Sequence, residues 1–148
     1  SMVYGRKMFV WSALLAGLML KSVCASADEN PSLQLRAASG LKAGKVRDGT
    51  LLMSGRVSSN SSHVGFRLLC RSEPESGHPS RCTLSGQRDP GHRLRVRLSG
   101  PVWRPGAQSD GAVITYATGA ADFRLEADGD QYVDADTWTV ALSASVLN

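Results

Sequence analysis

Apolar and polar residues alternate along the chain with a period of two. The clearest example covers residues 92–98, where leucine and valine positions alternate with Arg93, Arg95 and Arg97. This pattern is typical of a strand that buries one face and exposes a basic face to solvent. A longer alternation near the C-terminus predicts a strand over Thr137–Leu147. Its apolar positions are Trp138, Val140, Leu142, Ala144 and Val146.

Further short segments show the same alternation and are separated by turn-forming dipeptides. The additional predicted strands are Ser32–Ala37 and residues 50–58, 64–71, 82–85, 112–117 and 121–127. The turn signals are Asp48-Gly49, Asn60-Ser61, Pro90-Gly91, Pro105-Gly106, Asp110-Gly111 and Asp128-Gly129. No segment after residue 27 shows an apolar stripe of helical period with capping residues. Short strands at this spacing predict an all-β fold, an immunoglobulin-like antiparallel β-sandwich, with a small barrel as the alternative.

Residues 1–27 have the composition of a cleavable secretory signal peptide. Arg6 and Lys7 precede an apolar run of thirteen residues, 8–20. A membrane-spanning helix needs roughly 20 such residues. The run is therefore too short for a membrane anchor, and we expect a protein that does not span the membrane.

The residues after the apolar run predict where this leader ends. Ala25, Ser26 and Ala27 form the small-x-small pattern that signal peptidase accepts. We expect cleavage after Ala27, which leaves one mature domain of residues 28–148 with one hydrophobic core. Ser1 is interpreted as a cloning remnant ahead of the initiating methionine. A buried N-terminal helix is the alternative interpretation of the apolar run.

Removing the predicted leader changes the charge of the protein. The full chain carries 17 basic and 13 acidic residues; the leader holds three of the basic ones, so the mature domain keeps 14 and a net charge of +1. This balance argues against nucleic-acid binding. The charges are segregated: residues 81–104 hold six arginines against Asp89, and residues 122–136 hold six acids against Arg124. These two poles are either solvated faces, which we favour, or contact surfaces.

The mature domain keeps two of the three cysteines, Cys70 and Cys82, because Cys24 lies in the predicted leader. An even pair in an exported chain predicts a disulfide. It would close a loop of eleven intervening residues, and by loop entropy it should stabilise the fold by about 3 kcal/mol. No second cysteine pair or histidine pair lies at ligand spacing, so no metal site is expected.

Candidate catalytic chemistry is sparse in this chain. The histidines, His63, His78 and His92, lie in predicted loops or at strand edges, and no nucleophile motif accompanies them. We therefore expect a protein that is not an enzyme and uses no cofactor; a hydrolase site assembled in space is the remaining alternative. Residues 128–136 carry acids that could serve Ca²⁺, but Val133 stands where an EF-hand loop requires glycine. A polar turn before the last strand is the favoured interpretation.

The row formed by Arg93, Arg95 and Arg97 is the candidate receptor face. Guanidinium groups in a row can bind anionic glycans, sulfates or acidic lipids. A solvated face that discourages aggregation is the interpretation we favour. The segments around Trp103 and Tyr116 are weaker adhesive candidates, because a sandwich of this size usually buries its tryptophans.

Four features, taken in order, resemble one bacterial family. They are the signal peptide, residues 46–57 (VRDGTLLMSGRV), the block HRLRVRL at 92–98 followed by WRP at 103–105, and residues 127–140 (ADGDQYVDADTWTV). The chain resembles the minor tip subunits of chaperone–usher fimbriae, the AfaD-like invasins and the related Saf-type tip proteins, over most of residues 32–142. The second cysteine, Cys82, departs from the family pattern as we know it.

The resemblance implies an immunoglobulin-like fold that lacks its final strand. A periplasmic chaperone would fill the gap during export, and at the outer-membrane usher the N-terminal strand of a major pilin subunit would replace it. An incoming strand satisfies unpaired backbone groups and covers a hydrophobic cleft. In this sequence the last strand is Thr137–Leu147, and the alternating apolar residues from Trp138 to Val146 would line the cleft.

The same resemblance bears on position in a fibre. If Ser32–Ala37 is the first core strand, only residues 28–31 precede it, too few for a donor strand. The subunit would then accept a strand and donate none, which places it at a fimbrial tip; alternatively, Leu33 and Leu35 begin a short donor segment. The expected function is adhesion to, or invasion of, host cells through an unidentified surface receptor. The rival is an exported immunoglobulin-like domain that binds a soluble ligand or inhibits another protein without strand donation.

Overall fold

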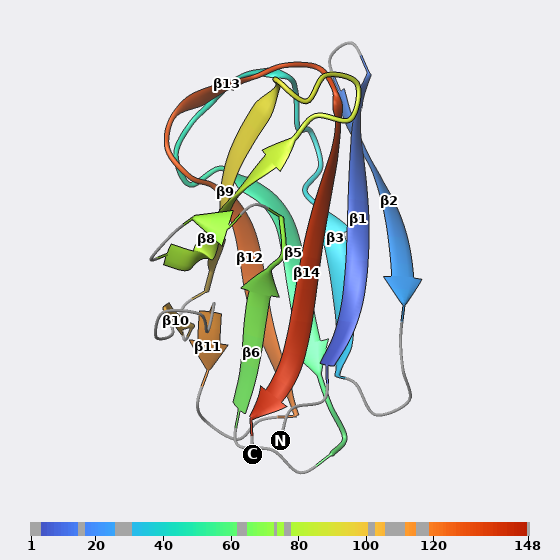
Figure 1. Cartoon of the computed structure of the whole chain (residues 1–148), viewed down its shortest axis with the longest axis vertical. Coiled ribbons are helices and arrows are strands. Elements are labelled where there is room, and N and C mark those ends of the chain that lie inside the picture. The colour runs from blue at the N-terminus through green and yellow to red at the C-terminus, as the bar shows by residue number, and fades with distance from the viewer. Residues whose placement is uncertain are drawn as a thin grey trace.

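Two six-stranded antiparallel sheets pack face to face in the protein (Figure 1). The computed structural model describes residues 4–14, 17–25, 31–61, 65–72, 74–75, 78–100, 103–105, 112–114 and 119–147. Every regular element within these ranges is a β-strand. The predicted all-β sandwich is therefore confirmed.

The first sheet, sheet A, has the strand order β10-β11-β6-β14-β1-β2. Its strands are β1 (Tyr4–Leu14), β2 (Gly17–Ala25), β6 (Gly65–Cys70), β10 (Arg104–Pro105), β11 (Ala112–Ile114) and β14 (Thr137–Leu147). The longest two, β1 and β14, lie side by side (Figure 1). The C-terminal strand thus sits inside the sheet, between β6 and a strand from the other end of the chain.

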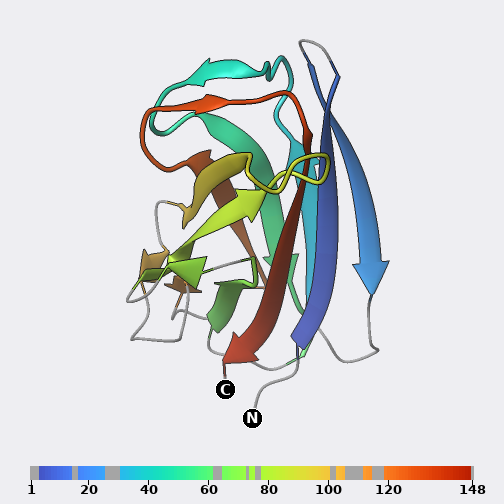
Figure 2. The same ribbon diagram turned by 45° about the horizontal axis from the view of Figure 1, so that its top comes forward.

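The second sheet, sheet B, has the order β3-β5-β12-β9-β8-β7. Its strands are β3 (Ser32–Ala37), β5 (Leu51–Ser58), β7 (Pro74–Glu75), β8 (His78–Ser85), β9 (Arg93–Ser99) and β12 (Ala120–Ala127). A two-stranded sheet of β4 (Gly44–Val46) and β13 (Gln131–Val133) covers one end of the sandwich (Figure 2).

The hydrophobic core lies between the sheets and follows the alternation in the sequence. On β9, Leu94, Val96 and Leu98 are buried while the arginines between them face outward. Trp103 packs edge-to-face against Phe123, with ring centroids 6.2 Å apart, and its Nε1 donates to the carbonyl of Asp122 at 2.7 Å. The tryptophan that was a weak adhesive candidate is therefore mostly buried, whereas Tyr116 lies outside the described residues.

Most predicted strands agree with the structure within a few residues, and β3 and β14 have the predicted bounds. The very short strands β4, β7, β10 and β13 were not predicted. One of them, β13, lies inside residues 128–136, where we expected only a polar turn; it pairs with β4 from Gln131↔Val46 to Val133↔Gly44. Parts of the predicted strands 64–71 and 112–117 lie outside the described residues.

The N-terminal segment forms a β-hairpin rather than a helix. Its two strands, β1 and β2, pair from Arg6↔Ala25 to Leu14↔Gly17. The alternative of a buried N-terminal helix is therefore wrong for the described part of the segment. Among the described residues, no helix is long and apolar enough to span a membrane.

Candidate functional site

Strand β14 has a neighbour on each edge. On one edge, β6 pairs with it from Leu142↔Cys70 to Leu147↔Gly65. On the other edge, β1 pairs with it from Tyr4↔Ser145 to Ser12↔Thr137 (Figure 1). The edge that the sequence predicted to need a donor strand is thus occupied, in antiparallel orientation, by the segment predicted to be the leader.

The inward row of β14 consists of the residues predicted to line the donor-strand cleft. They are Trp138, Val140, Leu142, Ala144 and Val146, and each is at most 3% exposed with β1 in place. The row belongs to the hydrophobic core cluster between the two sheets. Sheet B covers this row from across the core. The burial of the row also depends on the strand that lies beside β14.

The fit between β1 and this row is incomplete. In register, Trp11 and Phe9 pair with Trp138 and Val140, but Lys7 pairs with Leu142 and Gly5 with Ala144. Residues paired across antiparallel strands occupy the same face, so lysine and glycine stand at register positions that belong to an apolar row. In addition, the indole Nε1 of Trp138 is buried without a hydrogen-bond partner among the described residues, which costs stability.

The outer face of β14 is also covered near its C-terminal end. Ser143 and Ser145 are buried, and the Nε of Arg71 donates to Ser143 Oγ at 3.1 Å. The next residue, Ser72, accepts from the amide of Ala141 through its Oγ at 3.1 Å. The sequence offered no signal for these contacts, because a serine at an outward strand position ordinarily indicates exposure.

The predicted disulfide is confirmed. Cys70 and Cys82 are bonded, with an S–S distance of 2.04 Å, and both are buried. Cys70 ends β6 in sheet A and Cys82 lies on β8 in sheet B. The bond therefore ties the two sheets together beside β14.

The arginine row on β9 faces outward but is largely paired. Arg97 contacts three carboxylates: Asp48 at 2.6 Å, Asp128 at 3.2 Å and Glu126 at 3.3 Å. The Gly129 amide, and after it Arg97, hold the pKa of Asp48 below its ordinary value, while Asp48 raises the pKa of Arg97. The acidic pole found in the sequence thus folds back onto the basic pole.

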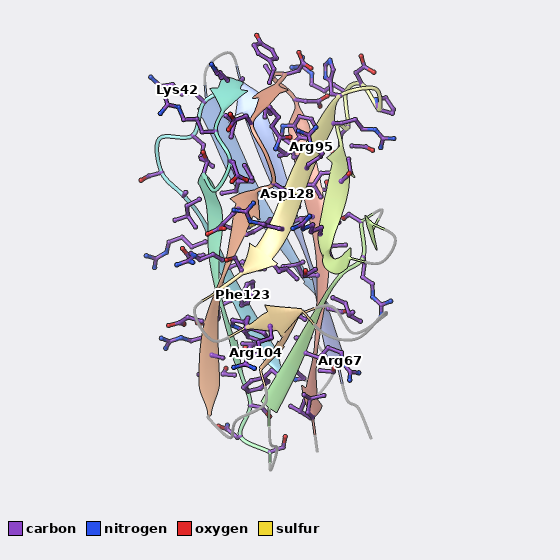
Figure 3. All side chains as sticks on the ribbon, turned by 90° about the vertical axis from the view of Figure 1, so that its left-hand side faces the viewer. Lys42, Arg67, Arg95, Arg104, Phe123 and Asp128 are labelled. Atoms are coloured by element: carbon purple, nitrogen blue, oxygen red, sulfur yellow. A yellow bond between two sulfur atoms is a disulfide. The ribbon has the colours of Figure 1, made fainter. Side chains whose placement is uncertain are left out.

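The other two members of the row are also hydrogen-bonded. Arg95 donates from Nη2 to the carbonyl of Asp130 at 3.3 Å, and Arg93 from Nη1 to Ser85 Oγ at 2.9 Å. Asp128, directly after β12, donates its amide to the carbonyl of Arg95 on β9 at 3.0 Å, and Figure 3 shows the two residues near each other. The row supplies structural contacts to the 128–131 segment, and its role as a receptor face stays a prediction.

Asp136, the one fully buried carboxylate among the described residues, has a structural role that the sequence did not predict. Its oxygens accept from the amides of Arg88 at 2.8 Å and Asp89 at 3.1 Å, and from the Thr137 amide. His92 Nδ1 lies 2.8 Å from Asp136 Oδ2. The carboxylate therefore fixes the 88–92 loop to the start of β14.

The titration of this pair follows from its contacts. Burial disfavours the charged carboxylate, but the amide of Arg88, His92 and the remaining amide donors outweigh it, so the pKa of Asp136 lies below its ordinary value. The hydrogen bond to Asp136, supported by the charges of Asp134 and Asp89, raises the pKa of His92. Both partners are therefore charged together over a pH range that includes mildly acidic conditions.

We predict a pH-dependent difference in stability between the protein and an Asp136→Asn variant. A carboxyl group whose pKa is lowered by folding stabilises the fold at pH values above its pKa in the unfolded chain. This stabilisation is lost as the pH falls through its pKa in the folded protein. A raised histidine pKa stabilises the fold below about pH 6.5, and this is lost as pH rises through the folded pKa. The difference in thermal midpoint should therefore be largest between about pH 4 and pH 6.5.

The control for this prediction is Asp134→Asn. Asp134 approaches His92 Nε2 only at 3.8 Å and its side chain is 47% exposed, so this variant should change the midpoint little at any pH. A difference for Asp136→Asn that is constant from pH 4 to pH 8 would contradict the assigned charge pair.

Residues of the acidic segment 128–136 are occupied by these protein contacts. Among the residues that the structure describes, no group of three or more His, Cys, Asp or Glu side chains is arranged to hold a metal ion. Of the histidines considered as catalytic candidates, only His92 has a described side chain. Its neighbours are carboxylates, and no nucleophilic hydroxyl or thiol is recorded among its contacts in the described ranges.

Comparison with known proteins relates this architecture to bacterial fimbrial subunits. Residues 42–144 match the family model described as Enterobacteria AfaD invasin protein. Protein AfaD of Escherichia coli is 28% identical over 116 residues, which cover 76% of this chain and 77% of that protein. The crystal structure of the Salmonella SafD adhesin has a TM-score of 0.75 and 38% identity, covering 79% of this chain and 84% of that chain.

A second solved structure supports the fold. The minor tip subunit HdaB of the E. coli Hda pilus has a TM-score of 0.73 at 24% identity, covering 80% of this chain and 84% of that chain. The family match spans most of the chain, and the matched segment includes β5, β9, β12 and most of β14. The protein is therefore a member of the AfaD invasin family.

Proposed function

We propose that the protein is an exported fimbrial tip subunit that attaches bacteria to host cells or promotes their entry. In this proposal a chaperone–usher system assembles it: a periplasmic chaperone and then a major pilin subunit supply the strand that lies beside β14. It acts by binding a host-cell surface receptor and not by catalysis. Membership of an invasin family supports the adhesive role.

The observation that carries the proposal is the pairing of β14 with β1. The pairing covers most of β14, from Thr137 to Ser145. If the leader is cleaved after Ala27, both β1 and β2 are removed and this edge loses its hydrogen-bond partners. An open edge beside an apolar row exposes a template for strand addition.

The mismatches in the β1–β14 register support a different natural partner. A donor strand with apolar residues opposite Leu142 and Ala144 would cover the inward row better than Lys7 and Gly5 do. Lysine and glycine at these register positions leave two residues of the apolar row without apolar cross-strand partners. We therefore infer that β1 occupies the edge where a donor strand would bind, although its sequence matches the apolar row of β14 poorly.

The pairing of β3 supports a subunit that accepts a strand and donates none. Strand β3 pairs with β5 along its whole length, from Ser32↔Ser58 to Ala37↔Met53. Leu33 is 1% exposed, which supports a core role for this segment and argues against the alternative that it is a donor segment. With cleavage after Ala27, the few residues ahead of β3 are too short to complete another subunit, which favours a place at the fimbrial tip.

The rival function has one observation in its favour. The chain completes sheet A with its own β1, as an exported domain that needs no donor would do. Such a domain would bind a soluble ligand or inhibit another protein while retaining residues 4–25. The two functions differ in whether the mature domain, residues 28–148, is stable alone.

The adhesive role is tested with beads that carry residues 28–148 completed by a fused apolar strand. These beads should attach to cultured epithelial cells well above beads that carry serum albumin. Heat-unfolded protein on the same beads is the matched control, because it has the same amino-acid composition but no folded binding surface. Equal attachment of folded-protein beads and albumin beads would contradict the adhesive role.

A further inference from the structure

The outer face of sheet B carries a groove that runs across β3, β5 and β12. Its volume is about 540 Å³. The floor is the row Leu35–Gly55–Phe123, whose members are paired in register across the three strands. Because strand residues alternate between faces, the residues on either side of this row point outward and form two walls.

The first wall consists of Arg36, Ser54 and Arg124, which are also paired in register. Neighbouring strands lie about 4.8 Å apart, so the Cα atoms of the two arginines are separated by roughly 10 Å, with the short serine between them. Figure 3 shows long side chains that project outward from β5 and β12. Two guanidinium groups therefore flank a gap that a small anionic group can enter.

The two arginines of this wall keep donors available. Within the described ranges, no hydrogen bond or ion pair joins the guanidinium group of Arg36 to another residue. Arg124 is bound through its Nε to Glu126 Oε2 at 3.0 Å, and its side chain is 48% exposed. No contact of its terminal nitrogens is recorded among the described residues, so both can donate to a ligand.

The second wall consists of Gln34, Arg56 and Asp122. Arg56 donates to Asp122 twice, from Nε at 2.7 Å and from Nη2 at 3.3 Å. This pair holds both side chains in place. The hydrogen bond raises the pKa of Arg56 and lowers the pKa of Asp122, so both groups stay charged. The wall thus presents an amide, a carboxylate and a guanidinium edge without adding net charge.

We propose that this groove binds an acidic saccharide, a sugar that carries carboxylate or sulfate groups. Arg36 and Arg124 receive the anionic group through charge-assisted hydrogen bonds. Gln34, Ser54 and Asp122 offer donors and acceptors for sugar hydroxyls. An acidic peptide fits less well, because Phe123 is 2% exposed and the groove offers no apolar pocket to anchor a side chain.

This inference supplies a ligand class for the adhesive role proposed above and rests on it for its biological setting. It does not depend on strand donation, since the groove lies on sheet B and the donor-strand edge on sheet A. The saccharide titration can therefore fail while the adhesion and strand-donation tests succeed, and the reverse also holds.

The test is calorimetric titration of the full chain with defined probes. The probes are sialyllactose, a sulfated heparin tetrasaccharide, neutral lactose and hexaglutamate. We expect at least one acidic saccharide to bind at least tenfold more tightly than lactose and hexaglutamate. Replacing Arg36→Gln and Arg124→Gln together should weaken that binding about tenfold or more, as should Ser54→Glu, whose carboxylate would occupy the gap between the arginines.

The matched control is the double variant Lys42→Gln and Lys45→Gln. It removes the same charge from two exposed positions beside and within β4 but does not alter the groove. Its affinity should stay within about twofold of the unaltered protein once salt screens long-range charge. The proposal is overturned if neither acidic saccharide binds, if hexaglutamate binds as tightly, or if the control loses as much affinity as the groove variants.

Discussion

Replacing both Cys70 and Cys82 with alanine should lower the free energy of unfolding by about 3 kcal/mol. The bond closes a loop with a sequence separation of 12 and joins sheet A to sheet B. Without it the unfolded chain gains conformational freedom, and the contact between β6 and β8 loses its covalent link. Denaturant unfolding of the strand-completed domain, residues 28–148, would measure the change as a lower midpoint with a similar slope.

The control for this prediction is chemical. Reduction of the unaltered domain should shift the midpoint in the same direction as the double alanine variant. Thiol labelling of the unfolded, unreduced domain should find no reactive cysteine. A midpoint that neither reduction nor substitution moves would show that the bond contributes nothing to stability.

The strand layout could be predicted because burial in a sandwich has the same period as the sequence. The inward positions of β9 and β14 are apolar at every second residue, so their bounds and their buried faces followed from the pattern. Strands of two or three residues, such as β4 and β13, cannot show a period. They form because loops from distant parts of the chain meet, as in the pairing of Tyr132 with Lys45.

The contacts of charged residues were harder to predict. The sequence shows a basic and an acidic segment, but it does not show that Arg97 binds Asp48, 49 positions away. The role of Asp136 depends on amides 47 and 48 positions earlier in the chain. The groove on sheet B is hidden for the same reason, because its walls combine single residues from three strands.

The donor-strand site was predictable only in part. The alternation in Thr137–Leu147 identified the inward row, and all five of its members are buried. The partner strand is not encoded in β14, because any alternating apolar segment satisfies its edge. The same apolar residues that suggest a leader also suit a strand, which is why residues 4–14 can occupy that edge.

The second large effect concerns the stability of the mature domain alone. Without β1 and β2, residues 28–148 lose the ladder beside Thr137–Ser145 and uncover apolar side chains of β14. At roughly 25 cal/mol per Å² of apolar surface, this loss is comparable with the 5–15 kcal/mol that stabilises a whole domain. We therefore expect residues 28–148 to aggregate or to unfold at low temperature without a cooperative transition.

A fused donor strand should restore the fold. A strand attached after Asn148 through a short turn would run antiparallel to β14, as β1 does. Its apolar residues should alternate so that they pair with Trp138, Val140, Leu142 and Ala144. A version with lysine opposite Leu142 should restore less stability, and a strand of equal composition with its apolar residues grouped together should restore almost none.

The most direct measurement is thermal unfolding of residues 28–148 with and without the alternating fused strand. We expect a sharp, high-temperature transition for the fusion and a broad, low-temperature transition or aggregation for the domain alone. A sharp, high-temperature transition of the unfused domain that the fused strand does not move would contradict the incomplete fold, and with it the proposed place of this subunit at a fimbrial tip.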